Sequence, residues 1–116
     1  MRYICLVYFE KGAVSGLDPD AKAILDRDSM AYDQELDAAG HLIVAEALQA
    51  PASAVTVRVR DGKMSTTDGP FAETKEILGG FILIEARDLN EAIRIAGGIP
   101  LAKRGSIEVR PIIQWD

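Results

Sequence analysis

The stretch DGPFAETKEILGGFILIEA, residues 68–86, decides the fold because it joins a polar turn to the most apolar run of the chain. Phe81 to Ala86 is apolar on both faces of an extended chain, which is typical of a central strand covered on both sides. Asp68 to Glu76 contains a Gly-Pro turn and holds four ionisable side chains. We therefore predict a strand that begins after Gly79-Gly80, preceded by a loop that is either a binding site or an ordinary ion-paired turn.

A second run that is apolar on both faces lies near the start of the chain, from Tyr3 to Phe9. A loop with two glycines follows, from Glu10 to Leu17. Asp18 then precedes Pro19, which is the arrangement of a helix N-cap residue followed by a proline at the first helical position. Apolar residues recur at helical spacing as far as Gly40, which supplies the stop. These residues predict a central strand followed by a helix of about five turns.

Between this helix and the stretch that begins at Asp68, we expect a short strand and a hairpin. Leu42 to Ala45 is the best strand candidate, and Pro51 ends that segment. The residues from 55 to 60 alternate valine with polar side chains, which is typical of a strand with one wet face. Asp61-Gly62 predicts a type I′ turn. The register that such a turn sets pairs Arg60 with Lys63, Val59 with Met64 and Val57 with Thr66.

The last third of the chain predicts a helix and a closing strand. Asp88 is a helix N-cap, and Glu91, three residues later, completes a capping box. Gly97-Gly98 ends this helix. Ser106 to Ile113 has the pattern of the last strand, in which Pro111 indicates an edge position or a bulge.

The order of these elements predicts an α+β, ferredoxin-like βαββαβ fold with an inserted β-hairpin arm, in one domain spanning residues 1–116. Two helices cover only one face of an antiparallel sheet, yet the two central strands offer apolar side chains to both faces. We therefore expect the bare face to pack against the same face of a second subunit, as a two-fold homodimer.

Composition excludes several classes of function. The net charge is −5, with 13 basic residues spread along the chain, so a nucleic-acid backbone would be repelled. The single cysteine, Cys5, lies within an apolar run, which indicates a small buried side chain and a cytoplasmic protein. We expect no signal peptide and no membrane span, because no apolar run is long enough. With one histidine and one cysteine, we expect neither a metal site nor another cofactor.

The stretch Asp68 to Glu76, followed by Gly79-Gly80 and Phe81, resembles the signature of the DGPF branch of the YCII-related domain family. The resemblance extends over nearly the whole chain, through the opening strand, the hairpin arm and the closing strand with Ile107 to Pro111. It implies a ferredoxin-like subunit that dimerises into an α+β barrel, with a pocket between the sheet and the motif loop. Most members of that family have no assigned reaction.

The resemblance also implies two functions of different kinds. A branch of the wider YCII group is similar to an aromatic dehydrochlorinase that uses a His–Asp pair, with the histidine just after the first strand. This chain departs from that pattern, because Phe9-Glu10-Lys11 contains no histidine and the only one is His41. Relatives often lie beside, or are fused to, alternative sigma factors, which implies a regulatory or accessory role.

Asp68 and His41 are the candidate catalytic residues. A carboxylate near a desolvated sheet face can have a raised pKa and act as a general base, which is the functional interpretation of Asp68. The other interpretation is that Asp68 only holds the turn by accepting backbone hydrogen bonds. His41 either takes part in catalysis or is placed at a helix C-terminus because the dipole favours its protonated form.

The candidate ligand-binding residues are Tyr8, Phe71, Glu73 and Lys75. Lys75 and Glu73 suit an anionic or hydroxylated small molecule, but Lys75 also fits as the neutralising neighbour of Glu73 and Glu76. We assign Glu76 to such an ion pair. Phe71 either lines the pocket or fills the core, and Tyr8 either donates a phenolic hydrogen bond into the cleft or is a core residue. Three functions stay open: a carboxylate-assisted lyase or isomerase, a ligand-binding or accessory module without turnover, and a structural dimer.

Overall fold

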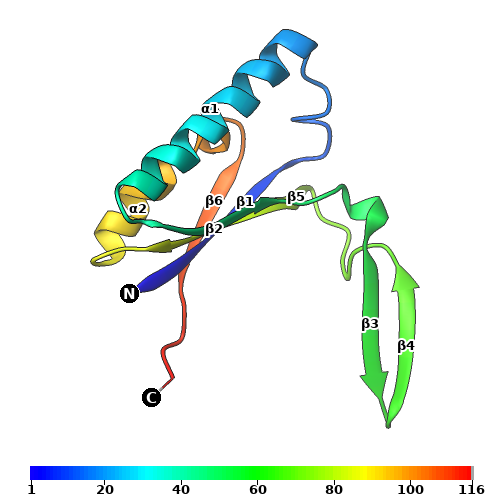
Figure 1. Ribbon diagram of the computed structural model, residues 1–116. Coiled ribbons are helices and arrows are strands. Elements are labelled where there is room, and N and C mark those ends of the chain that lie inside the picture. The colour runs from blue at the N-terminus through cyan, green and yellow to red at the C-terminus, as the bar shows by residue number, and fades with distance from the viewer. Residues whose placement is uncertain (116) are drawn as a thin grey trace.

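The computed structural model describes residues 1–115 and shows an α+β subunit (Figure 1). Short 3-10 turns, η1 (Pro51–Ser53) and η2 (Pro100–Lys103), connect the longer elements. The helices and strands are β1 (Arg2–Glu10), α1 (Pro19–Ala38), β2 (Leu42–Ala47), β3 (Val55–Arg60), β4 (Lys63–Asp68), β5 (Glu76–Glu85), α2 (Leu89–Gly97) and β6 (Ser106–Pro111). No helix among residues 1–115 is long and apolar enough to cross a membrane.

Four strands form one antiparallel sheet in the order β2-β5-β1-β6, and β3 pairs with β4 in a separate hairpin. Both helices lie on the same side of the four-stranded sheet (Figure 1). This is the ferredoxin-like arrangement, and it confirms the fold predicted from the order of elements. Strand β6, which contains Pro111, is an edge strand, as a proline at that position requires.

The core lies between the sheet and the two helices. Tyr3, Cys5 and Val7 alternate along β1 toward the helices, and Ile82 and Ile84 do so along β5. The phenolic hydroxyl of Tyr32 on α1 donates a hydrogen bond to the backbone oxygen of Ile95 on α2 at 2.6 Å, which ties the two helices together. Burial raises the pKa of the Cys5 thiol to about 11, so this cysteine packs as a small apolar side chain.

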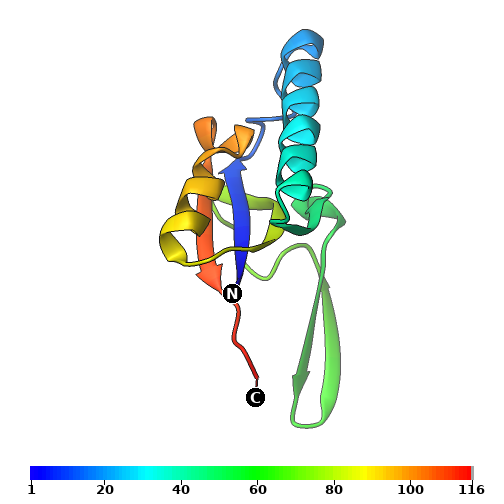
Figure 2. The ribbon, with the colours of Figure 1, turned by 60° about the vertical axis from the view of Figure 1, so that its left-hand side comes forward.

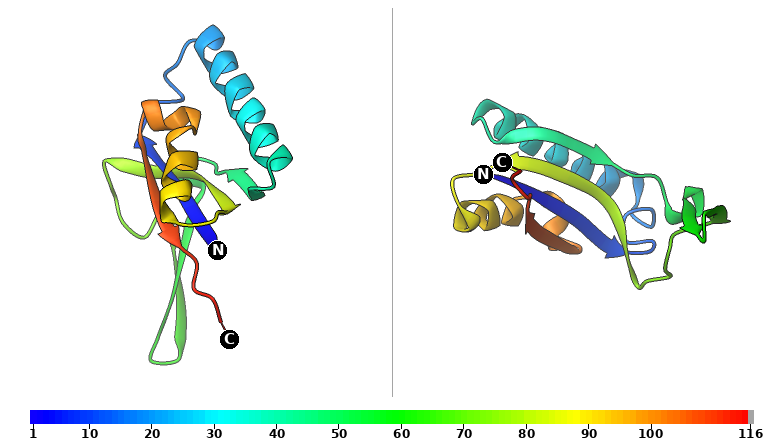
Figure 3. Two further views of the ribbon diagram at one scale, coloured as in Figure 1. Left: turned by 90° about the vertical axis from the view of Figure 1, so that its left-hand side faces the viewer. Right: turned by 90° about the horizontal axis from the view of Figure 1, so that it is seen from below.

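The other face of the sheet, which we call the open face, carries a second set of apolar side chains. Ile4 and Leu6 of β1 lie beside Leu83 and Phe81 of β5, and all four are only half-buried. Both helices lie on the opposite side of the sheet, as Figures 1 and 3 show. Within one subunit, this strip of apolar surface therefore stays partly accessible to water.

The hairpin β3–β4, which we call the arm, stands away from the sheet on its open side (Figures 1 and 2). Its turn has positive φ at Asp61 (52°) and Gly62 (74°), which is the type I′ geometry, and the three residue pairs predicted from it are confirmed. At its base, the Gly69 N–H donates to the backbone oxygen of Ala54 at 2.7 Å. The Thr56 hydroxyl also donates to the Gly69 oxygen at 2.8 Å.

The predicted boundary of the central strand β5 was wrong. This strand begins at Glu76, so Gly79 and Gly80 lie inside it rather than before it. Glycine is required here by close approach: a Cβ on Gly79 would overlap the Phe9 ring, and a Cβ on Gly80 would lie 2.8 Å from the Glu46 backbone oxygen. The glycine pair therefore allows tight packing within the sheet. From the sequence, we had expected it to mark the end of a loop.

Two smaller details at other element ends also differ from expectation. The last strand ends at Pro111 instead of Ile113. Asp88 caps α2 as predicted, since its carboxylate accepts a hydrogen bond from the Glu91 N–H at 2.9 Å. The Glu91 carboxylate, however, accepts from the Arg87 N–H at 2.8 Å rather than from the N–H of the cap residue.

Candidate functional site

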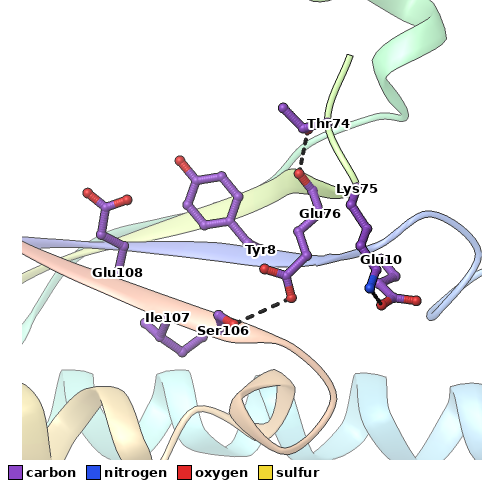
Figure 4. A pocket seen from close by; sticks show the side chains of 8 residues that line it. All are labelled: Tyr8, Glu10, Thr74, Lys75, Glu76, Ser106, Ile107 and Glu108. Atoms are coloured by element: carbon purple, nitrogen blue, oxygen red, sulfur yellow. Dashed lines mark hydrogen bonds and ion pairs between the residues drawn. The ribbon is translucent and has the colours of Figure 1, made fainter. Parts of the chain in front are cut away.

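An open cavity of about 630 Å³ lies at one end of the sheet, where β1 ends and where β5 and β6 begin (Figure 4). This volume is in the range of small-molecule sites. Tyr8 and Glu108 point away from the helices in Figure 4. The cavity is lined by Tyr8, Glu10, Thr74, Lys75, Glu76, Ser106, Ile107 and Glu108.

Strand pairing brings these residues together from three separate segments. On β1, Glu10 is the pairing partner of Glu76 on β5, and Tyr8 is the partner of Ser106 on β6. The β1–β5 register shifts between Val7 and Tyr8, so that Gly79 has no partner of its own. Such a bulge re-aims the side chains beside it. The end of β1 that carries Tyr8 and Glu10 is therefore set by this irregularity.

Two glycines make the packing at this end of β1 possible. Gly79 lies against the Phe9 ring, and Gly105 lies against the backbone oxygen of Tyr8. A side chain at either position would overlap these atoms. Because Phe9 stands between Tyr8 and Glu10, any shift of Phe9 also moves the two cavity residues next to it.

We expect Gly79→Ala to disturb the cavity through Phe9. Overpacking of this kind costs about 1–3 kcal/mol of the free energy of unfolding. Gly97→Ala is the matched control, because a Cβ on Gly97 meets no heavy atom within 4 Å. Chemical denaturation of both variants measures the effect, and amide chemical shifts of Tyr8 and Glu10 report the local change. Equal stability of the two variants, with unchanged shifts at β1, would contradict this interpretation of the bulge.

The charges in the cavity are unevenly compensated. Lys75 pairs with Glu10, with 3.4 Å between the Lys75 Nζ and the Glu10 carboxylate. Glu108 accepts hydrogen bonds from both Nε and Nη2 of Arg110, with 3.0 Å to Nε, and these bonds raise the pKa of the Arg110 guanidinium. Among the described residues, 1–115, the Glu76 carboxylate accepts a single hydrogen bond, which is long at 3.5 Å, from the Ser106 hydroxyl. Among the three carboxylates, Glu76 is thus the least neutralised.

This arrangement favours ligands that donate hydrogen bonds and carry no negative charge. Three glutamates face the cavity with one lysine, so an anionic ligand would meet net repulsion from the subunit. The hydroxyl groups of Tyr8, Thr74 and Ser106 lie in the same cavity and can both donate and accept. Thr74 is partly engaged, since it donates to the Glu76 backbone oxygen at 2.5 Å. Among residues 1–115, no group of three His, Cys, Asp or Glu side chains is placed to hold a metal ion.

The structure brings together two of the six site residues predicted from sequence. Tyr8 and Lys75 line the cavity, whereas Asp68, Phe71 and Glu73 do not. Asp68 is the last residue of β4 and pairs with Val55 in the arm, and Phe71 is 81% exposed in the loop that follows.

His41 lies at the opposite end of the sheet from the cavity. Its Nδ1 is 2.8 Å from the backbone oxygen of Glu85, at the far end of β5 from Glu76. Glu76 and Glu85 are the first and last of the 10 residues of β5, so they lie about 30 Å apart at roughly 3.3 Å per residue. Neither His41 nor Asp68 lines the cavity. Their catalytic roles therefore stay predictions.

Sequence analysis missed several of the cavity residues. Glu10 was assigned to a loop, Glu76 to a surface ion pair, and Ser106 and Glu108 to the closing strand without a role. An available signal was the ends of the predicted strands: Glu10 directly follows the first, and Ser106 begins the last. In a sheet where both neighbours of the first strand are antiparallel to it, these ends meet.

The fold, the cavity and the sequence together define the class of this protein. It is a ferredoxin-like α+β subunit with an open cavity lined by acidic residues at one end of its sheet. The chain belongs to the YCII-related domain family, whose sequence pattern matches residues 1–116.

Known proteins that are similar to this chain include a bacterial relative and a solved structure. An uncharacterized protein of Rhizobium meliloti (strain 1021) is 36% identical over 114 residues, which cover 97% of this chain and 92% of the relative. The structure of 5-chloro-2-hydroxyhydroquinone dehydrochlorinase (TftG) from Burkholderia phenoliruptrix AC1100, in complex with 2,5-dihydroxybenzoquinone, superimposes with a TM-score of 0.55. That match is 16% identical in sequence and covers 100% of this chain and 94% of TftG, so it shows a shared fold.

Proposed function

We propose that this protein binds neutral, hydroxylated small molecules in the cavity and moves a proton on them with a carboxylate, as an isomerase or a lyase. The observation that carries the proposal is the position of Glu76, which faces the cavity with only one long hydrogen bond to its carboxylate. A carboxylate without a close cation is free to accept a proton from a ligand. Tyr8, in the same cavity, supplies a hydroxyl that can hold a ligand oxygen.

The proposed chemistry uses no group beyond these side chains. Glu76 takes a proton from a carbon or hydroxyl next to a ligand carbonyl, and the electron pair left behind forms a new double bond. The Tyr8 hydroxyl stabilises the negative charge that develops on the carbonyl oxygen by donating a hydrogen bond. Return of the proton to a different atom completes an isomerisation. Departure of a leaving group with its electron pair completes an elimination.

The fold relative gives independent support for the elimination branch. TftG is a dehydrochlorinase, and its structure holds a hydroxylated six-membered ring. Removal of HCl from 5-chloro-2-hydroxyhydroquinone, the compound in the name of TftG, is an elimination of the kind described above. We therefore choose hydroxylated rings as probes, and neutral ones because of the three glutamates in this cavity.

We further propose that the working unit is a cytoplasmic homodimer in which two open faces pack together. Ile4, Leu6, Phe81 and Leu83 supply the contact, because they are apolar, adjacent and only half-buried in one subunit. Tyr8 lies on the same face as Leu6, two residues further along β1, so the cavity is at the rim of this contact. A second subunit would exclude water from its inner side.

Calorimetric titration tests the proposal with three probes: hydroquinone and benzene-1,2,4-triol under nitrogen, and benzoate as the anionic control. We expect the two neutral rings to bind and benzoate not to bind. Glu76→Gln should weaken binding about tenfold, the effect of losing a charged hydrogen-bond partner worth roughly 1.5 kcal/mol. Glu35→Gln, an exposed glutamate on α1, is the control for the loss of one negative charge.

The same titration separates the other functions. Turnover is measured as chloride release from 5-chloro-2-hydroxyhydroquinone, because the three binding probes carry no leaving group. Binding of the neutral rings without chloride release would favour an accessory or regulatory module. No binding by any probe, or equal binding to Glu76→Gln and to the unsubstituted protein, would contradict the proposed site and favour a structural dimer. Asp68→Asn belongs in the series: lost binding with an unchanged melting temperature would assign Asp68 to the site, and a lower melting temperature alone would assign it to the turn.

A further inference from the structure

Outside the cavity and the open face, the arm carries an apolar surface that stays exposed among residues 1–115. Residues of β3 and β4 alternate between two faces, and pairing places Val59 beside Met64 on one of them. We call this the valine face. Its apolar members are 56–71% exposed: Val55, Val57, Val59 and Met64. Thr66 and Asp68 lie on the same face, opposite Val57 and Val55.

The opposite face of the arm is polar and suits water. Strand alternation and the register place Thr56, Arg58, Arg60, Lys63, Ser65 and Thr67 there. The valine face is therefore the more apolar of the two, and covering its four exposed apolar side chains would be favourable. An isolated two-stranded hairpin is also only marginally stable in water, so the arm gains stability from a partner.

The second unpartnered apolar segment is the C-terminal tail, which we define as residues 112–115. The Ile112 N–H donates to the backbone oxygen of Arg2 at 2.9 Å, so the tail starts from the edge of the sheet beside the first strand. Beyond it, Ile113 is 67% exposed and Trp115 is 87% exposed. An exposed tryptophan two residues from an exposed isoleucine is an apolar surface of its own.

The arm and the tail extend from the same side of the sheet, away from the helices, as Figures 1 and 2 both show. They lie at opposite ends of the sheet in the view from below in Figure 3. Within one subunit, the open face separates them. If the two-fold axis lies between the two packed sheets and perpendicular to the strands, the arm end of one sheet lies over the tail end of the other.

We propose that, in the homodimer, the tail of each subunit docks on the valine face of the partner's arm. The inference rests on the proposed sheet-to-sheet dimer and adds a second contact to it. Each arm strand has six residues and spans about 20 Å, whereas packed sheets are about 10 Å apart, so the arm reaches past the partner's sheet. The contact occurs twice and is self-complementary, as a two-fold interface requires.

This docking connects dimer formation to the cavity. The base of the arm continues through residues 69–73 into Thr74 and Lys75, which line the cavity. A partner tail that holds the arm also restricts this connection. The second subunit thereby fixes one wall of the site without supplying a side chain to its chemistry.

Trp115 provides the test, because it is the only tryptophan in the chain. In the dimeric protein, we expect the fluorescence of Trp115 to be blue-shifted relative to that of tryptophan in water and to be weakly quenched by acrylamide. Val57→Glu puts a charge on the valine face and should shift the emission to the red, with a several-fold rise in quenching. Ser65→Glu adds the same charge to the polar face, and its emission should equal that of the unsubstituted protein.

Sizing with light scattering is run on the same samples. A dimer whose tryptophan emits as if fully exposed would overturn the docking of the tail and leave the cavity and the open-face contact intact. A monomeric unsubstituted protein would overturn both the docking and the dimer. Ligand binding in the cavity would still be tested separately by the calorimetric titration. If Val57→Glu does not fold, Trp115→Ala replaces it: faster amide exchange in β3 and β4 supports the docking, and unchanged exchange overturns it.

Discussion

Leu83→Glu is expected to convert the proposed homodimer into a monomer that keeps its fold. Leu83 lies on the open face, where its cross-strand neighbours are Ile4 on β1 and Val44 on β2. Neither neighbour can pair with a carboxylate. In a sheet-to-sheet dimer, the two-fold axis buries two such carboxylates at once, and a buried unpaired charge is strongly unfavourable. A total of at least about 4 kcal/mol raises the dissociation constant about a thousandfold.

Sizing with light scattering at micromolar concentration measures this change. In the isolated subunit, the introduced carboxylate faces water, so the far-ultraviolet circular dichroism should stay the same. Met30→Glu is the control, because Met30 is 63% exposed on α1, on the side of the sheet away from the proposed contact. A Leu83→Glu variant that remains a dimer would contradict packing through the open face.

Ile84→Ala is expected to lower the free energy of unfolding by about 2–5 kcal/mol. Ile84 is next to Leu83 in β5 but points to the helices, and its side chain is fully buried. It lies between Tyr3 of β1 and Leu42 of β2, so the missing atoms leave a cavity in the centre of the sheet. A domain of this size has a total stability of about 5–15 kcal/mol, so the loss is a large part of it.

Urea denaturation of the variant gives this value, with Ile43→Ala as the matched control. Ile43 has the same side chain but is 46% exposed on β2, so its loss should cost much less. Comparable destabilisation by the two substitutions would show that the core is not where the structure places it.

The fold was predictable because its signals are local. The Asp61-Gly62 turn fixes the register of the arm, and Asp18-Pro19 and Asp88 fix where the two helices begin. The start of β5 was missed for the opposite reason. Gly79 and Gly80 indicate a break in a single sequence, and only their neighbours across the sheet, Phe9 and Glu46, show why glycine is needed inside a strand.

The cavity was only partly predictable, because it is assembled from chain segments that are far apart in sequence. Lys75 and Tyr8 were found, the first as part of the motif and the second as the end of a strand. Glu10, Glu76 and Glu108 come together only through the register of β1 with β5 and β6. The motif itself divides: its first residues belong to the arm, and its last three line the cavity.

We propose that this protein binds its ligand at the acidic end of the sheet. The most direct measurement is a titration of the isotope-labelled protein with hydroquinone, followed residue by residue through the amide signals in NMR spectra. We predict that Tyr8, Lys75 and Ser106 shift together in a saturable way while residues of the α2 surface, such as Gly97, stay unchanged. Saturable shifts that gather elsewhere, or none around these three residues, would contradict the claim.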